Sequence, residues 1–267
     1  MTTAPAIMQD FSPILQTMPD VRVIEQNHEG QRIWVKQAVG SKSKAWHRVQ
    51  AAFSKVIRNP MLRPTVLQCG RSGLREEAAR IRRFYEAGFH VPQILDQCEQ
   101  YIVLSDLGGT LERHLKNLRR DGKLEECKPL LLSAVRELAR LHKAGLVHGR
   151  PHVKDLVYSA DNGGRIGFLD LEEDPQAVMP FDCACSRDIW LLLCSSVPYL
   201  NDEGAYIETM FDAYQQESGM SPSPFLRKLL RALSPLCKLA RTLERYMHVG
   251  KDVRNAAIVN ERLLLMM

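Results

Sequence analysis

Residues 146–170, LVHGRPHVKDLVYSADNGGRIGFLD, constrain the fold of this chain more than any other part of the sequence. A predicted helix at 128–143 leads into them, and its apolar residues share one face at Leu131, Val135, Leu138 and Leu141. A polar loop around His148 follows, and then a predicted β-hairpin that turns through residues 161–164. The hairpin ends in an apolar strand, and Asp170 comes directly after it. A helix, a charged loop and a hairpin in this order indicate a fold that mixes helices and strands.

The parts of the chain before and after Thr110 differ in pattern. Before it, short β-prone runs surround a helical pattern that Gly88 is expected to end. We predict strands at 21–24, 32–36, 91–95 and 101–104, a basic and partly helical segment at 41–57, and a helix at 74–87. After Thr110 we predict helices at 111–118, 128–143, 187–197, 202–217, 224–247 and 252–265. Pro235 should kink or split the fifth of these helices.

These patterns predict an α+β fold with two lobes, a small β-rich N-terminal lobe and a helical C-terminal lobe. We assign residues 1–19 to an N-terminal extension and residues 20–106 to the small lobe. Residues 107–267 then form the helical lobe, which contains the charged loop. With 45% hydrophobic residues in 267, the chain can bury a substantial core.

Charge is distributed unevenly along the chain, whose formal net charge is +5. Residues 31–75 carry ten Lys or Arg and no acid, and residues 225–267 carry nine basic residues against three acidic ones. Residues 170–188 carry six acidic residues and one basic residue. Basic faces attract phosphate-rich partners such as nucleotides and anionic lipid head groups. Nucleic acid is the weaker expectation, because the basic segments lack a recognition motif with interleaved aromatic residues.

No targeting or membrane-spanning segment is predicted. The seven cysteines lack the spacing of a disulfide framework or a zinc site, so we expect reduced thiols in a cytoplasmic protein. No signal-peptide pattern is visible, and no apolar run approaches the ~18 residues of a membrane span. One apolar set near the C-terminus has two interpretations, core packing of the helical lobe or peripheral contact with the anionic face of the inner membrane. Its members are Leu226, Leu229, Leu230, Leu233, Leu236, Leu239, Leu243 and Met247.

The charged loop resembles the catalytic loop of protein kinases, in which His-x-Asp is followed by four residues and then Asn. His148 occupies the first position, Arg150 stands in place of the catalytic Asp, and Asp155 stands in place of the Asn. These three are the candidate catalytic residues. We expect His148 to act structurally, by hydrogen bonding around the loop and Asp170.

Phosphoryl transfer from ATP depends mainly on positioning and charge. It needs a cation on the phosphates, oxygen ligands for Mg²⁺ and a group that orients the attacking hydroxyl. Lys36, at the end of the predicted strand at 32–36, is the candidate cation that holds the nucleotide. Its candidate partner is Glu77 in the helix that follows, although the adjacent Glu76 is an alternative.

In order and spacing, residues 20–200 resemble the lipopolysaccharide core-sugar kinases, the Kdo and heptose kinases of the protein-kinase superfamily. The matching residues are Lys36, Trp46, Asn59-Pro60-Met61-Leu62, Glu77, Gly88, Pro92, Ser105-Asp106-Leu107-Gly108-Gly109, His148, Asp170-Leu171-Glu172 and Asp188. The resemblance implies a two-lobed kinase that uses ATP and Mg²⁺ and phosphorylates a lipopolysaccharide core sugar. A protein Ser/Thr hydroxyl and a small molecule remain alternative acceptors.

The resemblance also implies roles for individual residues. Asp106 would lie at the hinge that contacts the nucleotide, and Asp170 would be a Mg²⁺ ligand. Asp155 would be the second metal ligand, because a carboxylate can replace an Asn amide oxygen on Mg²⁺. Asp188 would start a helix and tie down the backbone of the catalytic loop, and it is also a candidate N-cap.

Two features depart from the kinase pattern. No Gly-x-Gly-x-x-Gly loop lies between the first strands, where only Gly30 is available. Arg150 stays charged and cannot accept a proton, and base catalysis contributes about 10²–10⁴ in rate. The protein is then either an atypical active kinase or a pseudokinase that binds nucleotide or a partner without efficient transfer. In the active form, which we favour, Asp155 or another acid orients the hydroxyl, and Arg150 clamps a phosphate or the substrate.

Overall fold

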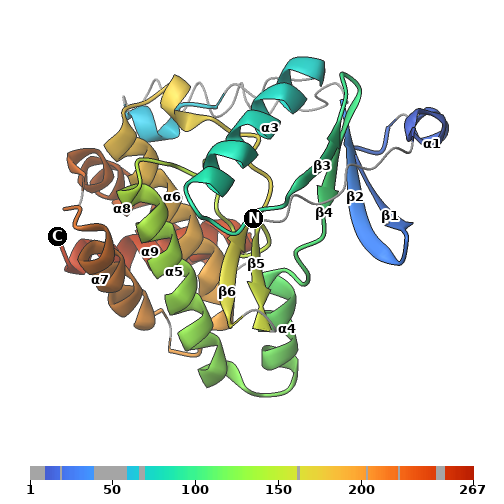
Figure 1. Ribbon diagram of the computed structural model, residues 1–267. Helices are drawn as coiled ribbons and strands as arrows, with labels where there is room; N and C mark the ends of the chain where they lie inside the picture. Colours follow the sequence, from blue (N-terminus) through green and yellow to red (C-terminus); the bar gives the residue numbers. More distant parts are fainter. Residues whose placement is uncertain are drawn as a thin grey trace.

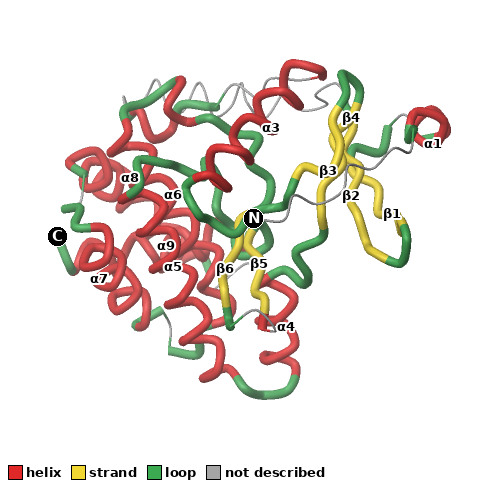
Figure 2. The backbone as a smooth tube through the Cα atoms, in the orientation of Figure 1, coloured by secondary structure: helices red, strands yellow, loops and turns green. Residues whose placement is uncertain are grey.

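The computed structural model describes residues 10–18, 20–38, 59–65, 70–160, 163–202, 204–221, 223–244 and 250–267. A small β-sheet lies on one side of the molecule and a group of helices on the other, with helix α3 (Gly70–Glu86) beside the sheet (Figure 1). Figure 2 shows the same division, with one further strand pair in front of the helices. The predicted two-lobed α+β fold is therefore confirmed. The segment predicted at 41–57, which contains Trp46, lies outside the described residues.

The small sheet has four strands in the order β1 (Val23–His28), β2 (Gln31–Gln37), β4 (Tyr101–Ser105) and β3 (Ile94–Gln97). Each neighbouring pair is antiparallel. β1 and β2 are joined by a two-residue turn in which Glu29 and Gly30 have φ of 51° and 78°. Positive φ at both positions is typical of the hairpin turn that matches the twist of the strands, and it favours Gly30.

Alternation along β2 separates the two faces of the sheet. Ile33 and Val35 pack with Leu15, which belongs to helix α1 (Ser12–Thr17). Lys36 points to the opposite face, where it meets Glu77 of α3. The strand pattern therefore directs this lysine toward α3.

Helix α3 ends as the sequence predicts. Gly88 has φ of 84°, and the next residue, Phe89, donates its N–H to the Phe84 carbonyl at 3.0 Å. A glycine in the left-handed region at this point closes the last turn of the helix.

The helical lobe is built around α5 (Cys127–Lys143), whose predicted apolar face is completely buried. Helices α4 (Leu111–Arg120), α6 (Phe181–Ser196) and α7 (Tyr206–Ser218) pack against α5. Helices α8 (Pro224–Leu243) and α9 (Lys251–Leu265) pack on each other and on α6. Short 3₁₀ turns lie at Pro60–Leu62, Leu124–Glu126, Pro175–Ala177 and Val197–Tyr199. No helix in the described ranges is long and apolar enough to span a bilayer.

A two-stranded hairpin, β5 (Leu156–Ser159) and β6 (Arg165–Phe168), carries two of the predicted site residues. Leu156 lies opposite Phe168, so Asp155 before β5 and Asp170 after β6 emerge from the same end of the hairpin. The Phe168 ring packs edge-on against the rings of Phe84 and Phe89. These contacts fix the hairpin to the end of α3 and bring both aspartates toward the small lobe.

The prediction that a helix begins at Asp188 is wrong. α6 begins at Phe181, after Pro180, so Asp188 lies on the second turn of the helix and is neither its first residue nor its N-cap. The helix begins earlier than predicted because its first turns also face the core, where Cys183 and Cys185 are buried.

α8, which was predicted to kink or split at Pro235, does not split there and runs from Pro224 to Leu243 as one helix. Pro235 has no N–H to offer the Arg231 carbonyl. Both residues are exposed, so water can satisfy that carbonyl.

Candidate functional site

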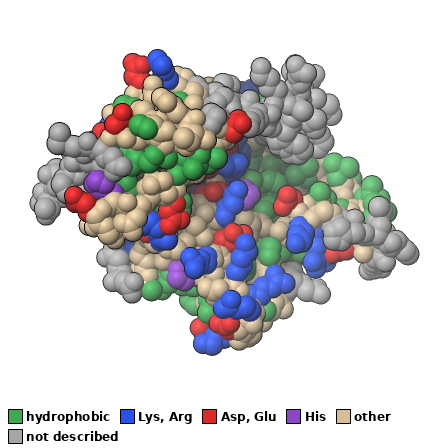
Figure 3. All heavy atoms as spheres, turned by 90° about the vertical axis from the view of Figure 1, so that its right-hand side faces the viewer, with side chains coloured by type: hydrophobic (Ala, Val, Ile, Leu, Met, Phe, Trp, Pro, Cys, Tyr) green, Lys and Arg blue, Asp and Glu red, His purple; other side chains and the backbone are tan. Residues whose placement is uncertain are grey.

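A pocket of about 400 Å³ lies between the small sheet and the open end of the β5–β6 hairpin. Its apolar wall contains Val23, Ile81, Leu104, Leu107, Val157 and Leu169, and its charged end contains Lys36, Glu77, Lys154, Asp155 and Asp170. Figure 3 views the molecule from the side of the sheet and shows acidic and basic side chains gathered near the middle of this face. An apolar wall with a charged end suits a ligand that has one flat apolar part and one highly charged part.

Lys36 is held between two carboxylates at the charged end. Its Nζ donates to Glu77 Oε1 at 2.5 Å and to Asp170 Oδ1 at 3.0 Å. Burial by itself would lower the pKa of Lys36, but Glu77 and Asp170 outweigh burial and raise the pKa above its usual value. Glu76, the alternative partner, is exposed. Lys36 is therefore a permanent cation that Glu77 fixes in position.

Asp170 follows β6 with φ of 56°, in the left-handed region. A non-glycine residue in this conformation stores backbone strain, and such residues concentrate at functional sites. Its Oδ1 accepts from Lys36, while Arg150 Nη2 donates to Oδ2 at 3.2 Å. Burial would raise the pKa of Asp170, but Lys36 and Arg150 lower it below its usual value. Asp170 is therefore an ionised carboxylate with a cation on each oxygen.

Asp155 is a buried carboxylate with an unused oxygen. Its Oδ2 accepts no hydrogen bond from the described part of the chain. Burial raises the pKa of Asp155 to about 6, and the charge of Asp170 acts in the same direction. A buried carboxylate oxygen that accepts no hydrogen bond destabilises the fold. A bound cation would satisfy this oxygen, so Asp155 is suited to be a metal ligand.

The pair Asp155 and Asp170 matches the way proteins hold Mg²⁺, through one or two carboxylates together with phosphate oxygens and water. Among the described residues, no group of three or more His, Cys, Asp or Glu side chains is arranged to hold a metal. A cation here would therefore depend on oxygens from a bound phosphate.

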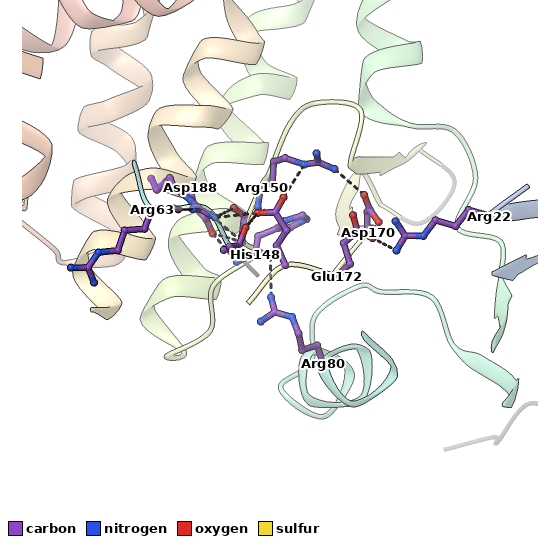
Figure 4. A network of polar contacts seen from close by, with 12 residues as sticks. Arg22, Arg63, Arg80, His148, Arg150, Asp170, Glu172 and Asp188 are labelled. Carbon is purple, nitrogen blue, oxygen red and sulfur yellow. Dashed lines mark hydrogen bonds and ion pairs between the residues drawn. The ribbon is translucent and has the colours of Figure 1, made fainter. Parts of the chain in front are cut away.

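Arg150 is not among the described residues that line the pocket, but it contacts Asp170, which is, and 40% of its side chain is exposed. Its Nε lies 3.5 Å from Glu173 Oε1, and Figure 4 shows its guanidinium reaching toward Asp170. Burial would lower the pKa of Arg150, but Glu173, Asp155 and Asp170 raise it. A guanidinium cannot take a proton from a hydroxyl, but it can bind an anion or neutralise a carboxylate.

Asp188 holds the loop backbone. Its fully buried carboxylate accepts from the His148 N–H at 2.7 Å and from the Gly149 N–H at 3.1 Å. Gly149 has φ of 107°, and a Cβ there would lie 2.6 Å from the Glu173 carbonyl oxygen. Only glycine can occupy this position without moving the backbone.

Arg80, which the sequence analysis did not single out, fixes the same loop from α3. It is buried and donates to the carbonyls of Leu171, Val147 and His148 at 2.9, 2.8 and 3.0 Å. Arg187 of α6 adds a bond to the Gly149 carbonyl at 2.9 Å. A signal for Arg80 is its place three residues after Glu77, near the buried face of α3.

His148 lies beneath the loop and is not among the described residues that line the pocket. Burial lowers its pKa to about 4, so the ring is neutral. Its Nδ1 accepts from the Arg150 N–H at 3.3 Å, and its ring lies against Phe168. These contacts help to shape the loop, while the predicted hydrogen bonding to Asp170 is not found among the described residues. The catalytic role of His148 stays a prediction.

Asp106 borders the pocket, but its carboxylate is already engaged. Trp34 Nε1 donates to Oδ1 at 2.8 Å, and Arg32 Nη2 donates to Oδ2 at 2.7 Å. The Gly108 N–H lies 3.2 Å from the same Oδ2. The side chain thus ties β2 to the segment between the lobes.

The pocket is also lined by two basic residues, Arg22 and Lys154, which the sequence analysis did not single out. Arg22 precedes β1 and forms an ion pair with Glu172. Lys154 is exposed next to Asp155 and has no ion-pair partner in the described part of the chain. The absence of a glycine-rich loop was a signal for Arg22, because another group must then close this side of the pocket.

Comparison with known proteins gives a match to one protein family and to one similar protein. The model of the lipopolysaccharide kinase (Kdo/WaaP) family matches residues 17–188, a range that contains the pocket and the loop. A protein of Haemophilus influenzae, described as uncharacterized, is 27% identical over 154 residues, which is 57% of this chain and 54% of that protein. The match therefore spans about half the length of the curated relative.

Proposed function

Because the chain belongs to the lipopolysaccharide kinase (Kdo/WaaP) family, we propose that it transfers a phosphoryl group from ATP, with Mg²⁺, to a hydroxyl of a lipopolysaccharide core sugar. The observation that supports this most is the position of Lys36. It is a buried cation, fixed by Glu77 and placed beside Asp170 at the charged end of a pocket. A kinase needs this arrangement to hold nucleotide phosphates.

The pocket accounts for nucleotide binding in two parts. The apolar wall, which includes Leu104 and Val157, would cover the base, and Lys36 would pair with the phosphates. Asp106 would act indirectly, since Arg32 and Trp34 already occupy its oxygens and it shapes the hinge through them.

Asp170 and Asp155 would hold Mg²⁺, which when bound neutralises charge on the phosphate oxygens. Binding a cation would satisfy the unused Oδ2 of Asp155 and keep that carboxylate ionised at neutral pH. Asp170 keeps one oxygen on Lys36, which links the metal ligands to the phosphate-binding lysine.

The acceptor would enter beside Arg150. Since Arg150 cannot act as a base, Asp155 is the carboxylate available to orient the attacking hydroxyl, and Arg150 would hold a negative group on either substrate. A protein hydroxyl is the alternative acceptor. In this proposal residues 20–106 and 107–267 are the two lobes that close on the nucleotide.

The first test is a calorimetric titration of the full chain with ATP in the presence of Mg²⁺. We expect saturable binding to the wild type and its loss in Lys36→Met and Asp170→Asn. Lys116→Ala is the matched control, because Lys116 is exposed on α4 and, among the described residues, forms an ion pair only with Glu112. Absence of nucleotide binding to the wild type would refute both the kinase and a nucleotide-binding pseudokinase.

One observation favours the pseudokinase alternative: Arg150 places a cation on the Asp170 oxygen that a metal would use. In that case ATP would bind without transfer, and Arg150→Asp would create activity where the wild type has none. Turnover by the wild type that depends on Asp170 would exclude the pseudokinase.

A further inference from the structure

Helix α8 is apolar on two different faces. In its first half, Leu226, Leu229 and Leu230 are at most 1% exposed and pack in the core of the helical lobe. In its second half, Leu236 and Leu239 are 51% and 55% exposed, and Leu243 is 37% exposed. Core packing therefore explains Leu226, Leu229 and Leu230 but not Leu236, Leu239 and Leu243. Met247, the last member of the apolar set, lies outside the described residues.

The exposed residues form a continuous line. Ala232, Leu236, Leu239 and Leu243 recur at i, i+4, i+7 and i+11, which places them on one face of a helix. Pro235, also exposed, lies beside them. We call this set the apolar stripe of α8.

Positive charge flanks the apolar stripe. From Pro224 to Leu243 the helix carries five Lys or Arg and no Asp or Glu. Lys228, Arg231 and Lys238 are exposed, follow one another along the same side of the stripe, and have no ion-pair partner among the described residues. Arg241 is the exception, since it contacts Glu244 and Glu261.

The apolar stripe lies away from the pocket. Figure 1 shows α8 on the side of the helical lobe opposite the small sheet, and no residue of α8 lines the pocket between the described parts of the two lobes. A partner on α8 would therefore leave the nucleotide site open.

We propose that the apolar stripe and the cations beside it bind the surface of an anionic lipid membrane, with α8 lying parallel to the bilayer. Helices that lie in the interface combine exposed apolar residues with Lys and Arg, and their binding increases with both apolar area and anionic lipid. A second copy of the chain fits less well, because pairing two such faces would bring unpaired cations together without an acid to neutralise them.

The test is flotation of the full chain with vesicles, in the absence of nucleotide. We expect the protein to float with phosphatidylcholine mixed with phosphatidylglycerol, and to remain at the bottom with phosphatidylcholine alone. High salt should release it, because the Debye length falls to about 3 Å at 1 M salt.

Substitutions separate the contribution of the apolar stripe to membrane binding from that of the neighbouring cations. The double substitution Leu236→Glu and Leu239→Glu should abolish flotation, and Lys238→Ala should lower the partition coefficient about fivefold. Lys116→Ala on α4 is the matched control and should float as the wild type does. Circular dichroism and nucleotide binding should be unchanged in all variants, so a failure of the proposed kinase function would be seen separately.

Three results would overturn the inference. One is a wild type that does not float with anionic vesicles, and another is flotation that survives the Leu236 and Leu239 substitutions. The third is a dimer in solution, detected by light scattering, that those substitutions dissociate, since the stripe would then be an interface between copies. If the double variant fails to fold, the comparison of Lys238→Ala with Lys116→Ala still decides, because equal partition coefficients would contradict the role of the cations.

Discussion

At the scale of single residues, two carboxylates in one pocket differ because their neighbours differ. Asp170 lies between Lys36 and Arg150, which lower its pKa. Asp155 forms no ion pair with the described residues, and burial raises its pKa to about 6 although Lys154 and Arg150 act in the opposite direction. Asp170 is therefore ionised at neutral pH. Asp155 becomes fully ionised only above about pH 6 or when a cation is bound.

The raised pKa of Asp155 has a consequence for stability. Its folded pKa lies above the unfolded value of 3.8, so the ionised form destabilises the fold at neutral pH and this cost disappears as pH falls toward 4. We expect Asp155→Asn to raise the free energy of unfolding by up to about 3 kcal/mol at about pH 8, and by little at about pH 4. Urea denaturation at the two pH values measures this, with the exposed Asp121→Asn as control. An equal gain at both pH values would contradict the assigned cause.

Arg150 donates to the Oδ2 oxygen of Asp170, so in the proposed site it would compete with Mg²⁺ for that oxygen. Because the pair is partly exposed, we expect Arg150→Gln to lower the Mg²⁺ concentration for half-maximal nucleotide binding by about two- to fivefold. Arg71→Gln is the control, since Arg71 is exposed and pairs with Glu99 at another place. A variant that needs as much Mg²⁺ as the wild type, or more, would show that Arg150 does not compete.

At the scale of elements, the charged loop around His148 is held in place by helices α3 and α6. Asp188 of α6 binds two of its N–H groups, and Arg80 of α3 binds the carbonyls of Val147 and His148. Buried carbonyls that lose a donor cost about 1–3 kcal/mol each. The loop geometry therefore depends on α3 as well as on its own sequence.

We expect Arg80→Leu to destabilise the protein by about 3 kcal/mol or more, since it leaves three buried carbonyls without a donor. Arg82→Leu on the same helix is the matched control, because Arg82 is exposed and its one hydrogen bond within the described part of the chain is to the Gln97 side chain. Chemical denaturation of both variants measures the difference. Similar stability of the two variants would show that the contacts of Arg80 are not needed to hold the loop.

The sequence predicts which helices and strands form and in what order, but it predicts the first residue of a helix less accurately. Periodicity places α5 correctly, because an apolar face at helical spacing can be read from the chain alone. The start of α6 is missed, because the buried Cys183 and Cys185 precede the recognisable Asp188. The continuity of α8 at Pro235 depends on exposure, which no local pattern reports.

At the scale of the whole molecule, the structure brings most of the predicted site residues to one pocket, although His148 and Arg150 are not among the described residues that line it. Lys36, Glu77, Asp155 and Asp170 are far apart in the chain and line one pocket. The sequence offers only weak signals for Arg80 and Arg22, since a basic residue on a helix or before a strand usually faces solvent. Their roles depend on contacts with Leu171, Val147, His148 and Glu172, which are far from them in the sequence and which a local pattern does not specify.

The central claim, that this pocket transfers phosphate, is tested most directly by following the labelled γ-phosphate of ATP. The wild type and Asp170→Asn would be incubated with Mg²⁺ and a lipid-linked lipopolysaccharide core acceptor, and separately with a generic protein acceptor. We expect the wild type to label the core acceptor and Asp170→Asn to lose the label. A wild type that binds nucleotide but labels neither acceptor, or a label that is unaffected by Asp170→Asn, would contradict the claim.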